Sequence, residues 1–253
     1  MKLAASVPPT LVAMGVSLVA CSSGNTSVDV FAGSSLTDVL QTAETEFEAI
    51  NDGVDIRLNL AGSNALARQI EDGGTAELFI PADLTALDSI DPDLLGRSLP
   101  LAGNSLVMIA PANSAIPAQG PSPTPAEALA WATSFARCAS GVPCGDAADA
   151  WISAVADLPS ARTISIENNV RAVLAKVRTG EVDLGLVYRT DAIIAGDDII
   201  TIELGPETPR TLVTGFVVIS GNRDASAAAD RFLDYLADDD AQRLFRDAGF
   251  GML

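Results

Sequence analysis

The sequence predicts an α/β protein made of two doubly wound lobes joined by a hinge. Short apolar segments alternate with amphipathic helical segments along most of the chain. The alternation starts afresh after a polar break near residue 104, so two α/β lobes with more than one crossover fit the order better than a single sheet. Of the 253 residues, 48% are hydrophobic and 19% are charged, which is typical of a globular chain long enough for two lobes.

The first series reads strand, helix, strand, helix, strand. Apolar side chains recur at helical or at alternating spacing, and turn residues separate the segments. The expected elements are strand Val28–Ala32, helix Leu36–Ile50, strand Val54–Leu60, helix Asn64–Glu71 before Gly73 and Gly74, and strand Leu78–Ile80 before Pro81.

The second series carries more helices. Its expected elements are strand Asn104–Ala110, a proline-rich loop Pro111–Pro125, a helix near Ala126–Ala136, helices Ala147–Val155 and Val170–Arg178, strands Asp183–Tyr188 and Thr211–Ser220, and helices within Ala225–Asp247. We therefore expect residues 28–104 with 215–253 to form lobe 1 and residues 105–214 to form lobe 2.

The amino terminus is typical of an export signal. Within residues 1–20, Lys2 is the only charge, and an apolar run too short for a spanning helix follows it. The run ends in Leu-Val-Ala-Cys, which resembles a bacterial lipobox and predicts cleavage before a lipid-modified Cys21. Residues 21–27 would then be a flexible polar tether. The alternative is an ordinary secretory peptide in which Cys21 has no role.

Charge and composition exclude several classes of function. The formal net charge is −18, which repels nucleic acid and anionic lipid surfaces. The chain has no histidine, so it lacks the commonest general base and the usual catalytic triads. We therefore expect a protein that is not an enzyme and has no nucleic-acid partner.

The two remaining cysteines lie close together. Cys138 and Cys144 flank a short loop rich in turn residues, and no histidine or further cysteine completes a metal-ligand set. In an oxidising compartment such a pair predicts a local disulfide. On the chain-entropy model, closing so small a loop stabilises the fold only modestly.

Two serines occupy strand-to-helix corners. Ser35 follows the first strand in VFAGSSLTDVL, and Ser63 follows the second in AGSNALARQI. One interpretation is helix capping, since Ser35-Leu36-Thr37-Asp38 matches the capping-box pattern. The other is an anion site, because helix amino termini offer free N–H groups at the carboxyl ends of strands, where open α/β sheets bind ligands.

Six stretches between about Val28 and Phe250 form a recognisable series. They are VFAGSSLTDVL, AGSNALARQIEDGGTAELFIPAD, GNSLVMIAP, VPCG, NNVRAVLAKVRTGEVDLGLVYRTDA and AQRLFRDAGF. In this order they resemble successive blocks of the molybdate-binding proteins of bacterial ABC importers, and LARQIEDGGTAELFIPAD is the most specific piece. The resemblance implies a periplasmic binding protein fold of type II, with two lobes that close on a ligand.

The resemblance also implies the groups that hold the oxyanion. In that family one lobe supplies two serines, and the other supplies two backbone amides and a tyrosine hydroxyl. The matching positions are Ser35 and Ser63, the amides of Cys144 and Val170, and Tyr188. All five groups can donate hydrogen bonds, as a tetrahedral dianion without protons requires. No cofactor and no metal other than that of the oxyanion is expected.

The alternative to ligand binding is that these residues have purely structural roles. Ser63 would only cap its helix, Val170 would be a first-turn core residue, and Tyr188 would fill the cleft between the lobes.

We expect the protein to capture molybdate, and also tungstate, and to deliver it to the permease of an ABC importer. It would act outside the cytoplasm as a monomer, held to the membrane only through the lipid on Cys21. One alternative is a receptor of the same fold for sulfate, a ferric complex or an organic anion. Others are a secreted hydrolase with Ser34 or Ser35 as nucleophile, although no G-x-S-x-G motif is present, and the ligand-sensing domain of a transcription regulator.

Overall fold

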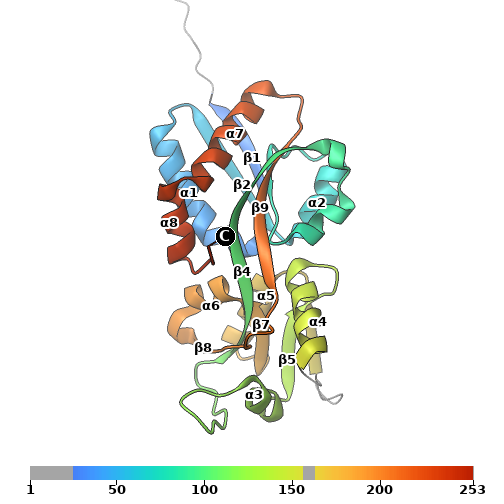
Figure 1. Cartoon of the computed structure of the whole chain (residues 1–253), viewed down its shortest axis with the longest axis vertical. Helices are drawn as coiled ribbons and strands as arrows, with labels where there is room; N and C mark the ends of the chain where they lie inside the picture. Colours follow the sequence, from blue (N-terminus) through green and yellow to red (C-terminus); the bar gives the residue numbers. More distant parts are fainter. Residues whose placement is uncertain (1–24, 156–162, 253) are drawn as a thin grey trace, which may run out of the picture.

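Two long antiparallel strands connect the lobes. β4 (Leu95–Pro111) and β9 (Arg210–Val218) pair from Leu95 opposite Val218 to Ser105 opposite Arg210. In Figure 1 they run side by side along the long axis and pass through both lobes. The computed structural model describes residues 25–155 and 163–252. Within them the strand order is β2-β1-β3-β9-β4-β7-β5-β6, with β8 beside β4, and the predicted two-lobed α/β fold is confirmed. The expectation against a single sheet is wrong, because β4 pairs with β9 and with β7 and so joins the strands of both lobes into one nine-stranded sheet.

The first lobe is the upper one in Figure 1. It contains β1 (Thr26–Gly33), α1 (Thr37–Ile50), β2 (Val54–Ala61), α2 (Ser63–Glu71), β3 (Leu78–Ile80), α7 (Arg223–Ala237) and α8 (Asp239–Asp247). Alternate residues of β1 serve two cores: Val28 and Val30 pack with α1, α7 and α8, whereas Phe31 packs with α2 on the other face. This period of two is what a strand buried on both faces requires.

The second lobe is built on the lower half of the same sheet. It contains α3 (Pro125–Trp131), β5 (Ser134–Cys138), α4 (Pro143–Val155), β6 (Thr163–Glu167), α5 (Val170–Arg178), β7 (Leu184–Tyr188), α6 (Arg189–Ala195) and β8 (Ile199–Ile202). Its core centres on the fully buried β7 and on Trp151 and Phe135. The residue limits predicted for the two lobes stay a prediction.

The strands of each lobe run so that their carboxyl ends meet the other lobe. β1 pairs in parallel with β2 and β3, and β5 pairs in parallel with β6 and β7. In the first lobe the chain leaves these ends at Gly33, Ala61 and Ile80. The corners that follow them face the corners of the second lobe.

The structure corrects several predicted elements. The helix expected near Ala126–Ala136 ends at Trp131, because the backbone N–H groups of Thr133 and Ser134 turn to the Asp183 carboxylate, at 2.7 and 2.9 Å, and β5 follows. β4 begins at Leu95 and not at Asn104, since its first half pairs with β9 across two irregularities. α4 begins at Pro143, and the predictions missed β6 and β8.

The amino-terminal predictions fall mostly on residues that the structure does not describe. The signal peptide at residues 1–20 and the lipidated Cys21 lie outside the described residues. β1 begins at Thr26, inside the predicted tether, because the Thr26 N–H donates to Gly53 O at 2.7 Å. No helix among residues 25–155 and 163–252 combines the length and the apolar character that crossing a bilayer requires.

Candidate functional site

A small cavity of about 20 Å³ lies where the two lobes meet. It is slightly larger than the minimum that holds one water, about 10–15 Å³. All of the residues that line it are uncharged, and they come from both lobes. Ser35, Ser63, Cys144, Val170 and Tyr188 are all among them, so the structure brings the five predicted residues to one place.

Ser35 lies in a short 3₁₀ turn, Ser34–Leu36, between β1 and α1. Its side chain caps no helix: neither this turn nor α1 has a side-chain cap. The capping-box interpretation is therefore wrong, because the 3₁₀ turn moves Ser35 ahead of the first turn of α1. The Ser35 hydroxyl is buried and has no hydrogen-bond partner. A buried hydroxyl without a partner costs about 1–3 kcal/mol, which a ligand at this position would recover.

Ser63 is the first residue of α2, and it does not cap that helix either. Instead its Oγ accepts a hydrogen bond from the backbone N–H of Ala82, at 3.0 Å, just after β3. Because a hydroxyl has one hydrogen, this contact leaves the Ser63 O–H free to donate into the cavity. This tertiary contact fixes the position of Ser63 and leaves its hydroxyl hydrogen available for a ligand.

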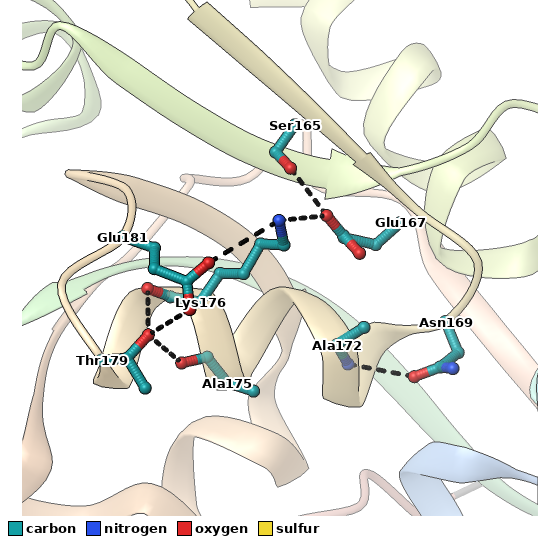
Figure 2. A network of polar contacts seen from close by, with 8 residues as sticks. All are labelled: Ser165, Glu167, Asn169, Ala172, Ala175, Lys176, Thr179 and Glu181. Atoms are coloured by element: carbon teal, nitrogen blue, oxygen red, sulfur yellow. Dashed lines mark hydrogen bonds and ion pairs between the residues drawn. The ribbon is translucent and has the colours of Figure 1, made fainter.

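Val170 opens α5, and Asn169 fixes this helix end. The Asn169 Oδ1 accepts from the Ala172 N–H at 3.0 Å, while Lys176 on the same helix pairs with Glu167 at 3.2 Å, as Figure 2 shows. With the Ala172 N–H satisfied, the N–H groups of Val170 and Arg171 have no acceptor within the helix. The interpretation of Val170 as a core residue is also correct, because its side chain is buried in the core of the second lobe, and Val170 is among the residues that line the cavity.

Cys144 is the second residue of α4. The N–H groups of Gly145 and Asp146 donate to Val142 O at 2.8 and 2.9 Å. Because Pro143 has no N–H, the Cys144 amide is the orphan donor of this first turn. A disulfide joins Cys144 to Cys138 at the end of β5. A Cβ on Gly145 would lie 1.8 Å from the Ala139 carbonyl oxygen, so only glycine lets this turn cross the strand end.

Tyr188 ends β7 and is almost fully buried. Its hydroxyl has no hydrogen-bond partner. Burial raises the pKa of Tyr188 far above its ordinary value of 10, and the nearby carboxylate of Asp83 raises it further. The hydroxyl is therefore protonated at neutral pH and can act only as a neutral group in the cavity.

The cavity is thus an array of donors: the hydroxyls of Ser35, Ser63 and Tyr188, and the amides of Cys144 and Val170. No group of three or more histidine, cysteine or acidic residues is placed to hold a metal ion in the described part of the chain. A small anion is the ligand class that such an array fits.

The sequence-based prediction missed two groups that shape the site. One is the backbone N–H of Ala82. The sequence feature that could have indicated it is Pro81, which ends β3 next to the ends of two other strands. The other is Asn169, which precedes an amphipathic helix in the pattern of an N-cap residue. Both act by orienting a predicted donor.

Comparison with known proteins agrees with this geometry. Residues 28–251 match the model of a family described as bacterial extracellular solute-binding protein. The molybdate-binding protein ModA of Escherichia coli (strain K12) is 32% identical over 236 residues, 88% of each chain. The putative ABC transporter substrate-binding lipoprotein YvgL of Bacillus subtilis (strain 168) is 28% identical over 252 residues, 91% of each chain.

A solved structure shows the same fold. The periplasmic molybdate-binding protein of Azotobacter vinelandii superposes with a TM-score of 0.76 at 19% sequence identity, over 89% of this chain and 99% of that chain.

Fold and site together define a two-lobed receptor of type II that encloses a small solute, and not an enzyme. The chain belongs to the molybdate-binding ModA family, within the bacterial extracellular solute-binding proteins. The alternative of a secreted hydrolase with Ser34 or Ser35 as nucleophile is therefore wrong. No imidazole exists in this chain to activate either hydroxyl.

Proposed function

We propose that this protein captures molybdate, and also tungstate, between its lobes and delivers the anion to the permease of an ABC importer. The observation that carries the proposal is the convergence of five uncharged donors from both lobes on one cavity. Two of the hydroxyls, on Ser35 and Tyr188, are buried without partners. The names of the Escherichia coli and Azotobacter vinelandii relatives support molybdate as the ligand.

The chemistry of the donors matches that of the anion. Molybdate and tungstate are fully ionised tetrahedral dianions at neutral pH, so they accept hydrogen bonds and have no proton to donate. The five proposed donors are Ser35, Ser63, Cys144, Val170 and Tyr188. Each charge-assisted hydrogen bond contributes about 1.5–3 kcal/mol. The net charge of −18 does not forbid binding, because salt screens distant carboxylates while the donors act at contact distance.

The mechanism we propose is capture by lobe closure. The donors of the first lobe and those of the second can reach one tetrahedron together only when the lobes are close. The anion therefore binds the closed form more tightly than the open form and shifts the equilibrium between them. A permease that recognises the closed form would then select the loaded receptor.

A calorimetric titration with molybdate, tungstate, sulfate and phosphate tests the proposal. We expect micromolar to nanomolar dissociation constants for molybdate and tungstate, about −8 to −12 kcal/mol, and much weaker binding of sulfate. Equal affinity for sulfate would favour the alternative receptor for another anion. Absence of binding by any of the four anions would refute the proposal.

We also propose that Cys21 carries a lipid that holds the receptor at the outer face of the cell membrane. The Leu-Val-Ala-Cys sequence supports this, as does the description of the Bacillus subtilis relative as a lipoprotein. Replacement of Cys21 by Ser should move the protein from the membrane fraction to the soluble fraction. A protein that stays in the membrane fraction would contradict the lipid anchor.

A further inference from the structure

One arginine contacts carboxylates of both lobes beside the anion site. Arg171 directly follows Val170 in the first turn of α5. Its Nε lies 2.7 Å from Asp191 Oδ1 on α6, in the same lobe, and its Nη2 contacts Asp38 Oδ2 on α1, in the other lobe. One contact therefore joins α5 to α6 within the second lobe, and the other joins α5 to α1 across the boundary between the lobes.

The two carboxylates differ in their surroundings. Asp191 is fully buried, and its oxygens have no regular hydrogen bond, so the 2.7 Å contact with Arg171 is a close charge pair without aligned hydrogen-bond geometry. Removing the cation would leave an unpaired buried charge. Asp38, in contrast, is 44% exposed. The contact between Arg171 and Asp191 lies within the second lobe, so a separation of the lobes leaves it intact. Such a separation breaks only the contact between Arg171 and Asp38.

The placement of this contact relates it to the ligand. Asp38 lies in the first turn of α1, three residues after Ser35, and Arg171 is next to Val170. The ion pair thus bridges the lobes within one helical turn of a donor from each side. A planar guanidinium can serve two carboxylates at once, which the point charge of a lysine does poorly.

We propose that Arg171 is a positioning residue of the anion site: anchored by Asp191, it binds Asp38 in the closed form and so slows the release of the anion. The inference rests on the proposed capture of an oxyanion. It assigns Asp38 and Arg171 no contact with the anion itself, so their loss changes how long the closed form lasts and not which anion is preferred.

Asp38→Asn tests the proposal in the purified full chain with molybdate as the probe. We expect the dissociation rate to rise about 2- to 5-fold, which corresponds to about 0.4–1 kcal/mol and lies within the range for partly exposed ion pairs. The association rate and the ratio of molybdate to sulfate affinity should not change. Raising the salt concentration should speed release from the unmodified protein and bring it towards the variant, since salt screens this contact.

Asp198→Asn is the matched control. Asp198 pairs with Arg178 at the other end of the same helix, both groups are about half exposed, and the pair lies within the second lobe. Like Asp38→Asn, this variant removes one negative charge that pairs with an arginine of α5. Unlike Asp38→Asn, it removes no contact between the lobes. Its dissociation rate should equal that of the unmodified protein. An equal rise in both variants would overturn the proposal, as would an unchanged rate in Asp38→Asn.

A double-mutant cycle removes the arginine without leaving a buried charge. Arg171→Met combined with Asp191→Asn eliminates both charges of this pair, and we expect it to release molybdate about as fast as Asp38→Asn. Adding Asp38→Asn to this variant should produce no further increase, because the contact is already absent. A further increase of the same size would show that Asp38 acts without Arg171 and would overturn the proposal.

Failure of the proposed function would be distinguishable from failure of this inference. If the unmodified protein binds none of the tested anions, small-angle X-ray scattering of the ligand-free proteins decides instead. A larger radius of gyration for Asp38→Asn than for the unmodified protein and for Asp198→Asn would support the contact between the lobes. Equal radii would overturn it.

Discussion

At the scale of single residues, the two serines of the site are held in different ways. The Ser35 hydroxyl has no partner in the protein, whereas the Ser63 Oγ accepts from the Ala82 N–H at 3.0 Å. Both hydroxyls can donate to an anion, but only Ser63 also satisfies a buried backbone group. The two serines should therefore respond differently to the same substitution.

Ser35→Ala and Ser63→Ala should each weaken molybdate binding about 10- to 100-fold, since each removes a charge-assisted hydrogen bond of about 1.5–3 kcal/mol. In the absence of ligand, Ser63→Ala should also lower the free energy of unfolding, by about 1–3 kcal/mol, because the Ala82 N–H loses its acceptor. Ser35→Ala should not lower it, because the Ser35 hydroxyl makes no hydrogen bond within the protein. Calorimetry and urea unfolding measure the two effects. Unchanged affinity would remove the serine concerned from the site.

Residue chemistry was the part of the site that the sequence indicated best. The resemblance named Ser35, Ser63, Cys144, Val170 and Tyr188, and the structure places all five around one cavity. Their role as ligands of an oxyanion stays a prediction. The partner of Ser63 could not be predicted, because Ala82 N–H is close to it only through the packing of three strand ends.

At the scale of the elements, α5 presents a backbone amide and not a side chain. Asn169 caps this helix through the Ala172 N–H at 3.0 Å, and Asn222 caps α7 in the same way through the Ala225 N–H at 3.2 Å. Only the first of these helix ends lines the cavity. The pair therefore separates helix stability from ligand binding.

Asn169→Ala and Asn222→Ala should each lower the free energy of unfolding by about 1 kcal/mol, the usual cost of losing an N-cap side chain. Only Asn169→Ala should weaken molybdate binding, because a frayed first turn no longer holds the Val170 amide in place. Thermal unfolding and calorimetry of both variants measure this. If Asn222→Ala weakened binding as much, the effect would come from global stability and not from the position of α5.

Element prediction succeeded where the period was unambiguous and failed where tertiary contacts decided. The helices of the first lobe, α1, α2, α7 and α8, follow strong 3.6-residue patterns, and the structure confirms them. β5 was read as the end of a helix because Ser-Phe-Ala-Arg-Cys is short and rich in residues that tolerate either state. This segment is a strand because it pairs with β6 and with β7, and both partners are distant from it in sequence.

At the scale of the whole molecule, the lobes approach closely beside the anion site. A Cβ on Gly62 would lie 2.6 Å from the carbonyl oxygen of Asn168 in the other lobe. The Asn64 side chain also donates to Gly141 O across the same boundary. The described arrangement is therefore a closed one, in which backbone groups of the two lobes are nearly in contact.

Gly62→Ala should hinder this closure while each lobe folds normally. We expect weaker molybdate binding, by about tenfold or more, with an unchanged melting temperature in the absence of ligand, because displacing one packed atom in the closed form costs about 1–3 kcal/mol. Gly221→Ala is the control, since a Cβ there would meet nothing within 4 Å. Equal affinity of Gly62→Ala and the unmodified protein would show that the lobes close less tightly in solution.

Stability should also depend on pH through one buried group. Burial raises the pKa of Asp191 from 3.8 to about 7, against the opposing effect of Arg171. The folded protein therefore holds this proton more tightly than the unfolded chain, and the free energy of unfolding falls as the pH rises from 3.8 to about 7. Urea unfolding at several pH values should show this slope in the unmodified protein and a shallower one in Asp191→Asn. Identical slopes would contradict the assignment.

The sequence by itself determined the class of fold and most of the helices, because periodicity is a local property of the chain, and its resemblance to a known family named the five candidate donors. Only the tertiary structure decided that five such groups meet in one cavity, that the Ser63 hydroxyl is oriented by Ala82, and that Arg171 joins Asp38 to Asp191. The physical reason is that these contacts join strand ends and helix ends distant in sequence, and their geometry exists only once the two halves of the sheet have formed and closed on each other.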